Sequence, residues 1–86
     1  MIEGAKEGDL VLCIDNMTHL HKDVARKMMY LTKGKVYTVF RDQATDGMWF
    51  QLYIINDYGN PEWFTNDRFI KVGNEEQAEM LRLIYA

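Results

Sequence analysis

The chain has 86 residues, an apolar content of 48% and a net charge of −3. This length and composition predict a single globular domain that spans residues 1–86 and argue against intrinsic disorder. No run of about 20 apolar residues occurs, so we expect no membrane-spanning segment. The single cysteine, Cys13, has no internal disulfide partner and the polar first residues lack the apolar core of a signal peptide, so we expect a cytoplasmic protein.

Charge is distributed unevenly along this acidic chain. Residues 19–35 carry five bases and one acid, a balance of +4, whereas residues 1–18 carry −3 and residues 36–86 carry −4. A basic segment in an acidic chain indicates either a contact with an anionic partner or a solvated charged face.

The first strand is expected at Leu10–Ile14, where a short apolar run (LVLCI) ends at the turn-forming pair Asp15–Asn16. Cys13 lies inside this run and is interpreted as a small core residue. Apolar residues then recur at helical spacing from Leu20 to Leu31, which predicts a short amphipathic helix inside a long loop. The alternative is an irregular excursion of the kind that follows the first strand of SH3 domains.

The middle of the chain predicts three further strands. Val36–Arg41 follows a glycine-containing turn, and Met48–Ile55 alternates apolar side chains on both faces, so we expect it to be central and covered on both sides. Asn56–Gly59 supplies the reversal, because Gly59 can take a positive φ. Pro61 then begins the returning strand.

The C-terminal third predicts a helical turn, a closing strand and a helix. Thr65 to Arg68 is expected to form the turn, with the Thr65 side chain bonded to a nearby N–H, before a strand at Phe69–Val72. Asn74 and Gln77 match a capping box, which predicts a C-terminal helix within 74–86, from about residue 75 to 85. A helix this short must dock its apolar side on the sheet or on another chain.

Five short strands, a long first loop and a helical turn before the last strand are the element order of an SH3-like barrel. The stretches that carry the match are EGDLV at 7–11, LTKGKVYTV at 31–39 and YIINDYG at 53–59, followed by Phe64 and Arg68–Phe69. They resemble the small SH3-like proteins of tailed bacteriophages, over residues 6–72. The resemblance implies a mainly β, five-stranded small barrel, to which the basic segment and the C-terminal helix are additions.

The sequence contains no strong motif for catalysis, cofactor binding or metal binding. Cys13 is a poor nucleophile at the centre of a strand, and His19 and His21 lack the further ligands that a stable zinc site needs. The sequence contains neither a glycine-rich phosphate loop nor a Gly-x-Ser-x-Gly turn. We therefore expect a protein that is not an enzyme, without catalytic residues, cofactor or metal site.

Aromatic and basic side chains are the candidate partner-binding residues. We expect Phe64 and also Tyr53 to lie in the core. We expect Tyr58, at the tip of a turn, to be exposed together with one of the two tryptophans. The candidates are Trp49, Tyr58 and Trp63 among the aromatics, and Lys22, Arg26 and Lys27 among the bases.

These residues and the resemblance together predict a non-catalytic binding module, encoded by a phage, that binds a host protein. One alternative is nucleic-acid binding through the basic segment 17–35, although dedicated nucleic-acid binders are usually basic overall. The other is a self-associating structural or assembly protein, a homodimer with its terminal helix at a two-fold interface.

Overall fold

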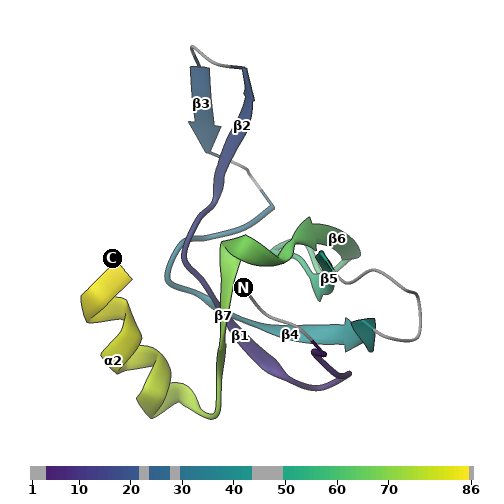
Figure 1. Ribbon diagram of the computed structural model, residues 1–86, viewed down its shortest axis with the longest axis vertical. Coiled ribbons are helices and arrows are strands. Elements are labelled where there is room, and N and C mark those ends of the chain that lie inside the picture. The colour runs from purple at the N-terminus through teal and green to yellow at the C-terminus, as the bar shows by residue number, and fades with distance from the viewer. Residues whose placement is uncertain (1–3, 22–23, 28–29, 44–49, 86) are drawn as a thin grey trace.

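The computed structural model describes residues 4–21, 24–27, 30–43 and 50–85. Within these ranges, five strands form an antiparallel sheet in the order β6-β5-β4-β1-β7 (Figure 1). Their bounds are β1 Leu10–Cys13, β4 Val36–Arg41, β5 Gln51–Ile55, β6 Pro61–Thr65 and β7 Phe69–Val72. The predicted mainly β architecture is confirmed.

The sheet is open rather than a closed barrel. In the described chain β6 and β7 are the two edge strands, and the 3-10 turn η1 (Asn66–Arg68) connects one edge to the other. The closed barrel that the sequence predicted is therefore not observed, because β6 and β7 do not pair with each other. The predicted bond from the side chain of Thr65 to this turn is also wrong, since that side chain caps nothing.

Strand β1 is buried on both faces. Val11 and Cys13 face the main core and Leu12 faces the opposite side of the sheet, while β4 and β7 pair with β1 along its two edges. The main core contains residues from every strand of the sheet and from the segments that precede β1 and β4: Ala5, Val11, Cys13, Leu31, Tyr37, Val39, Leu52, Ile54, Phe64 and Phe69. The predictions that Cys13 and Phe64 are core residues are confirmed.

Helix α2 (Glu75–Tyr85) covers the other side of the sheet over β1 and β7, as Figure 1 shows. Ala78 is fully buried against Leu12 and Val72, with Leu81 packed at the margin of the same cluster. The helix begins and ends where the sequence predicted.

Reciprocal side-chain bonds cap the start of α2. Asn74 Oδ1 accepts from the backbone N–H of Gln77 at 2.8 Å, and Gln77 Oε1 accepts from the N–H of Gly73 at 2.6 Å. The predicted capping box is thus present, with its return bond to the residue before the cap.

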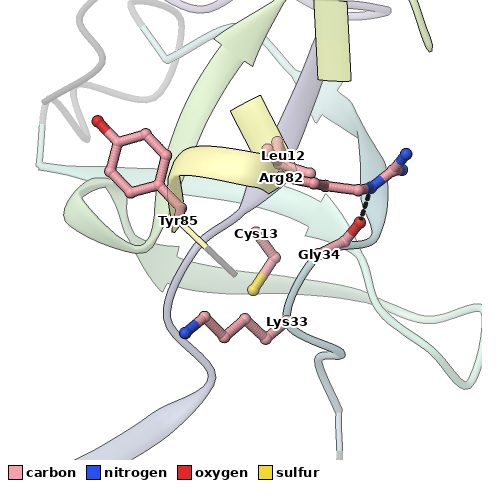
Figure 2. A pocket seen from close by; sticks show the side chains of 6 residues that line it. All are labelled: Leu12, Cys13, Lys33, Gly34, Arg82 and Tyr85. Carbon is pink, nitrogen blue, oxygen red and sulfur yellow. Dashed lines mark hydrogen bonds between the residues drawn. The ribbon is translucent and has the colours of Figure 1, made fainter. Parts of the chain in front are cut away.

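Arg82 ties the last turn of α2 to the loop before β4. Its Nε donates to the carbonyl oxygen of Gly34 at 2.5 Å (Figure 2). Its Nη1 pairs with the carboxylates of Glu75, at 2.6 Å, and Glu79. The apolar contact at Ala78 and this polar contact hold the helix at both ends, so α2 is a fixed part of the fold.

Residues 17–21 and 24–27 form two paired strands, not the predicted helix. Strands β2 (Met17–His21) and β3 (Val24–Lys27) pair with each other and stand away from the five-stranded sheet (Figure 1). Polar anchors fix the start of β2: Arg68 Nη1 donates to the carbonyl of Met17 at 2.6 Å, and the N–H of Met17 donates to Asp15 Oδ1 at 2.9 Å. These contacts hold the chain extended at the point where a helix would have to begin.

The reversal between β5 and β6 is the predicted one. Asn56 Oδ1 accepts from the N–H groups of Tyr58 and Asn60, each at 3.0 Å. Gly59 has a φ of +80°, a conformation that side chains other than glycine rarely adopt. The tip of this hairpin is therefore held by its own backbone and by Asn56.

Gln43 is buried although the sequence placed it in a polar connection. Its Oε1 accepts from the N–H of Ala5 at 2.9 Å, and its Nε2 donates to the carbonyl of Gln51 at 2.9 Å. One amide therefore fixes the N-terminal segment to the start of β5. The rest of the predicted connection, 44–47, and the first two residues of the predicted strand, Met48 and Trp49, lie outside the described residues.

The carboxylate of Asp57 joins the hairpin tip to the segment before β4. It accepts from Thr32 Oγ1 at 2.8 Å, Lys35 Nζ at 2.8 Å and the Tyr37 hydroxyl at 2.7 Å. Burial by itself raises the pKa of Asp57, but the bonds from Lys35, Tyr37 and Thr32 outweigh it and hold this pKa below its ordinary value of 3.8. The carboxylate therefore stabilises the folded state while it is ionised.

Replacing Asp57 with Asn should lower the free energy of unfolding by about 1–3 kcal/mol at pH 7, the usual range for hydrogen bonds to a charged group. A folded-state pKa below the unfolded one stabilises the protein above the unfolded pKa, and that contribution disappears as the pH falls through the folded pKa. Urea unfolding should therefore show that the difference in free energy of unfolding between the wild type and the variant decreases when the pH is lowered well below 3.8. The exposed Asp67→Asn variant is the control, and a loss that is independent of pH would contradict the assignment.

Candidate functional site

Aromatic side chains occupy the outer side of β4, β5 and β6, on the half of the sheet that α2 does not cover. Leu52 and Ile54 of β5 point into the core, so Tyr53 between them points outward, where it is half-buried. Trp63 of β6 lies directly opposite Tyr53 in the register. We call Phe40, Arg41, Tyr53 and Trp63 the aromatic face.

A β-bulge brings both Phe40 and Arg41 to this face. Val39 pairs with Ile54 and Arg41 pairs with Tyr53, so β4 has one residue more than β5 at this point. Strict alternation would place Phe40 and Arg41 on opposite sides. Instead the Phe40 ring lies 5.6 Å from the Tyr53 ring, and the Arg41 guanidinium lies 5.3 Å from the same ring.

Trp63 and Tyr53 hold each other in place across the two strands. Their ring centroids are 4.6 Å apart with an interplanar angle of 34°. At this spacing the two rings lie side by side, so each restricts the rotation of the other. Tyr53 thus has Trp63 on one side and Arg41 and Phe40 on the other, and the face presents a preorganised row of large side chains.

A second aromatic pair lies at the hairpin tip. Tyr58 is 59% exposed and Tyr30 is 47% exposed, and their rings meet edge to face at 5.5 Å. The N–H of Asp57 donates to the carbonyl of Tyr30 at 2.9 Å, so the pair is attached to the Asp57 network. The predicted exposure of Tyr58 is confirmed, and its ring partner is Tyr30.

The predicted binding residues are therefore distributed over separate parts of the molecule. Trp63 belongs to the aromatic face and Tyr58 to the hairpin tip. Arg26 and Lys27 lie in β3, in register with Thr18 and Met17 of β2. Trp49 and Lys22 lie outside the described residues.

Two sequence expectations about these strands are wrong. Tyr53 was expected in the core, and the strand that contains it was expected to be covered on both sides. The outer side of β5 remains half exposed because, in the described part of the chain, α2 packs over β1 and β7 and no element packs over Tyr53.

No protein-family model, curated protein or solved structure matches this chain. The resemblance to phage SH3-like proteins accordingly stays a prediction. The aromatic face must be judged by its own geometry and chemistry.

The thiol of Cys13 lies beside a small hollow under the C-terminal end of α2. Burial raises the pKa of the Cys13 thiol to about 11, so the group is protonated at neutral pH, and its Sγ lies 3.6 Å from the carbonyl oxygen of Asp15. The hollow in Figure 2, of about 10 Å³, has room for about one water molecule. Its lining residues are Leu12, Cys13, Lys33, Gly34, Arg82 and Tyr85.

Across 4–21, 24–27, 30–43 and 50–85, no three His, Cys, Asp or Glu side chains are grouped so as to hold a metal ion. Within the same ranges, no helix is both long enough and apolar enough to cross a membrane.

Sequence reasoning missed Phe40, Arg41 and Tyr30 as surface candidates. Alternation along Val36–Arg41 is compatible with an outward Phe40, but the bulge that turns Arg41 toward Tyr53 has no marker in the sequence. The pairing of Tyr30 with Tyr58 depends on contacts between residues far apart in the chain.

Replacing Trp63 with Ala should lower the free energy of unfolding by about 1–2 kcal/mol, because the indole is half-buried and the substitution mainly removes its contact with the Tyr53 ring. Replacing its buried neighbour Phe64 with Ala should cost about 3–5 kcal/mol. Urea denaturation of the two variants measures both values. An equal loss in both would mean that Trp63 is a core residue and not a surface one.

Proposed function

We propose that this chain is a non-catalytic binding module that binds a protein partner through the aromatic face. The observation that carries this is the contiguous row of Phe40, Arg41, Tyr53 and Trp63 on the uncovered half of the sheet. Tryptophan, tyrosine and arginine are the residues that most often dominate binding energy at protein interfaces. A row that is already held in place loses little side-chain entropy when a partner binds.

We further propose that the module is of the SH3-like class and is a cytoplasmic accessory protein of a phage, with a host protein as its partner. The strand order β6-β5-β4-β1-β7, the hairpin within the first long loop and the turn η1 before the last strand support the class. The phage origin and the host partner follow from the resemblance alone. The buried free thiol of Cys13 is compatible with a reducing compartment.

The test is affinity capture from a bacterial lysate with the wild-type protein and the double variant Arg41→Ala, Trp63→Ala as baits. A partner that depends on the aromatic face should bind the variant at least about 30-fold more weakly, the loss typical of an interface hot spot. Isothermal titration calorimetry with the purified partner measures this ratio.

The matched control is the double variant Tyr30→Ala, Tyr58→Ala, which removes the exposed pair at the hairpin tip. It should retain the affinity of the wild type within about threefold, since surface changes outside a hot spot have small effects. If the partner binds the variant of the aromatic face but no longer binds the variant of the hairpin tip, the binding site lies at the hairpin tip instead.

A second candidate function is nucleic-acid binding by the β2–β3 hairpin. The hairpin stands away from the sheet (Figure 1), and the sequence from residue 19 to 35 carries a balance of +4. A two-stranded ribbon fits the major groove of a duplex, and an isolated hairpin of this kind gains stability from a surface on which it rests.

The hairpin should therefore bind a mixed-sequence duplex in fluorescence anisotropy, with an affinity that falls steeply between about 50 mM and about 200 mM salt. Charge reversal of Arg26 and Lys27 should abolish this binding, whereas charge reversal of the exposed Lys71 in β7 should not. Absence of binding at the lower salt concentration would remove nucleic acid as a ligand of the hairpin.

A further inference from the structure

The two edges of the sheet differ in how their backbone groups are satisfied. In the described chain, β6 and β7 each have a neighbouring strand on one side only (Figure 1). Along an antiparallel edge strand, the N–H and C=O groups of successive residues point alternately toward the neighbour and away from it. The groups that point away can pair with a further strand unless the fold itself satisfies them.

At the β7 edge the fold satisfies most of these groups. The ladder with β1 leaves the N–H groups of Phe69, Lys71 and Gly73 pointing outward. The N–H of Phe69 donates to the carbonyl of Asn66, and the N–H of Gly73 donates to Gln77 Oε1 at 2.6 Å. The residue between them is a lysine, a side chain that protects edge strands against pairing. This edge is therefore closed to a further strand.

The ladder between β5 and β6 shows which groups of β6 point outward. The N–H of Asn66 donates to the carbonyl of Phe50 at 2.9 Å, so this pair and every second pair before it along β6 is bonded across the ladder. Trp63 and Thr65 belong to the intervening pairs and direct their N–H and C=O groups away from β5. The close approach of the Trp63 and Tyr53 rings fits such a pair, in which side chains lie closest together.

These outward groups of β6 are unpaired. Across the described residues, no group accepts a hydrogen bond from the backbone N–H of Trp63 or of Thr65. Pro61 occupies the remaining outward position and has no N–H, and the turn η1 begins directly after Thr65. The free edge is thus no longer than β6 itself, which has five residues, and this length fits a short extended segment.

The side chains of β6 indicate what such a segment would carry. Glu62 and Phe64 lie on the core side of the sheet, and Phe64 belongs to the main core. Glu62 Oε2 accepts from Asn56 Nδ2 at 3.1 Å, but among the described residues this carboxylate takes part in no ion pair. A residue opposite Phe64 would extend the core, which favours an apolar side chain. A residue opposite Glu62 would meet a carboxylate, which favours lysine or arginine.

We propose that the protein partner of the aromatic face adds an extended segment antiparallel to β6, as a further strand of the sheet. Backbone bonds form opposite Trp63 and Thr65. The segment carries an apolar residue opposite Phe64 and, two residues later, a lysine or arginine opposite Glu62. The residue between these two lies opposite Trp63, beside the indole. This inference rests on the function proposed for the aromatic face and specifies the form of its partner.

A library of random heptapeptides displayed on yeast, sorted with the full chain, tests the side-chain preference. Enriched peptides should contain an apolar residue followed two positions later by lysine or arginine. Sorting with the Glu62→Lys variant should select an acidic residue at the second position instead. Glu76→Lys makes the same charge change at an exposed site of α2 and should select the same peptides as the wild type. Enriched peptides without this pattern would overturn the roles of Phe64 and Glu62.

Backbone pairing is tested with N-methylated forms of one enriched peptide in isothermal titration calorimetry. Methylation of the residue between the apolar and basic positions removes the N–H that donates to the carbonyl of Trp63, so it should weaken binding at least about tenfold. Methylation of the apolar residue, whose N–H points away from β6, should change the affinity less than about threefold. Hydrogen exchange should slow at the amides of Trp63 and Thr65 in the complex and stay unchanged at Lys71.

The outcomes separate the mode of binding from the function of the aromatic face. A library without binders, or an affinity that falls equally or not at all with the two methylations, would overturn strand addition. If peptides of the latter kind still lose affinity for the Arg41→Ala, Trp63→Ala variant, the aromatic face remains the binding site and only the mode of binding is wrong. If peptides protect the amides of Trp63 and Thr65 but bind that variant like the wild type, strand addition holds and the aromatic face is not the binding site.

Discussion

Burial of β1 on both faces is the constraint on which the rest of the structure depends. The strand pairs with β4 and β7 along its edges, contributes Val11 and Cys13 to the main core and presents Leu12 to α2. Such a strand needs a layer on each side, and the chain supplies the second layer with the short helix α2. Ala78 is fully buried against Leu12 and Val72, so the helix completes the burial of β1 and is not an appendage.

The same constraint determines where the molecule is open. The single helix α2 packs against Leu12 of β1 and Val72 of β7, and within the described residues β4, β5 and β6 have no helix on their outer side. The outer side of these strands is therefore left to Phe40, Arg41, Tyr53 and Trp63, which pack on one another. In this way the covered half of the sheet completes the packing around β1, and the open half presents a row of large side chains that hold one another in place.

Elements with local signals could be predicted from the sequence. The glycine-containing turn before it marked the start of Val36–Arg41, the helical turn before it marked the start of Phe69–Val72, and the capping pair Asn74 and Gln77 marked the start of α2. The pairing of β2 with β3 could not be predicted, because the start of β2 is held by Arg68, which lies 51 residues from Met17 in the chain. The aromatic face was only partly foreseen, through Trp63, since Arg41 reaches it by a bulge and Tyr53 lies on strands that α2, which packs on β1 and β7, does not cover. Local sequence patterns thus predicted where several strands and the helix lie, whereas contacts between residues far apart in the chain determine which side chains these elements expose.

The most direct test of the aromatic face is a titration of ¹⁵N-labelled protein with the purified partner, followed in ¹H–¹⁵N correlation spectra. Binding at this face should shift the indole N–H signal of Trp63 and the backbone amides of Arg41 and Tyr53, while the amides of Leu12 and Ala78 keep their positions. Shifts confined to α2 or to the β2–β3 hairpin, with the signals of Trp63 and Tyr53 unchanged, would contradict a binding role for the open half of the sheet.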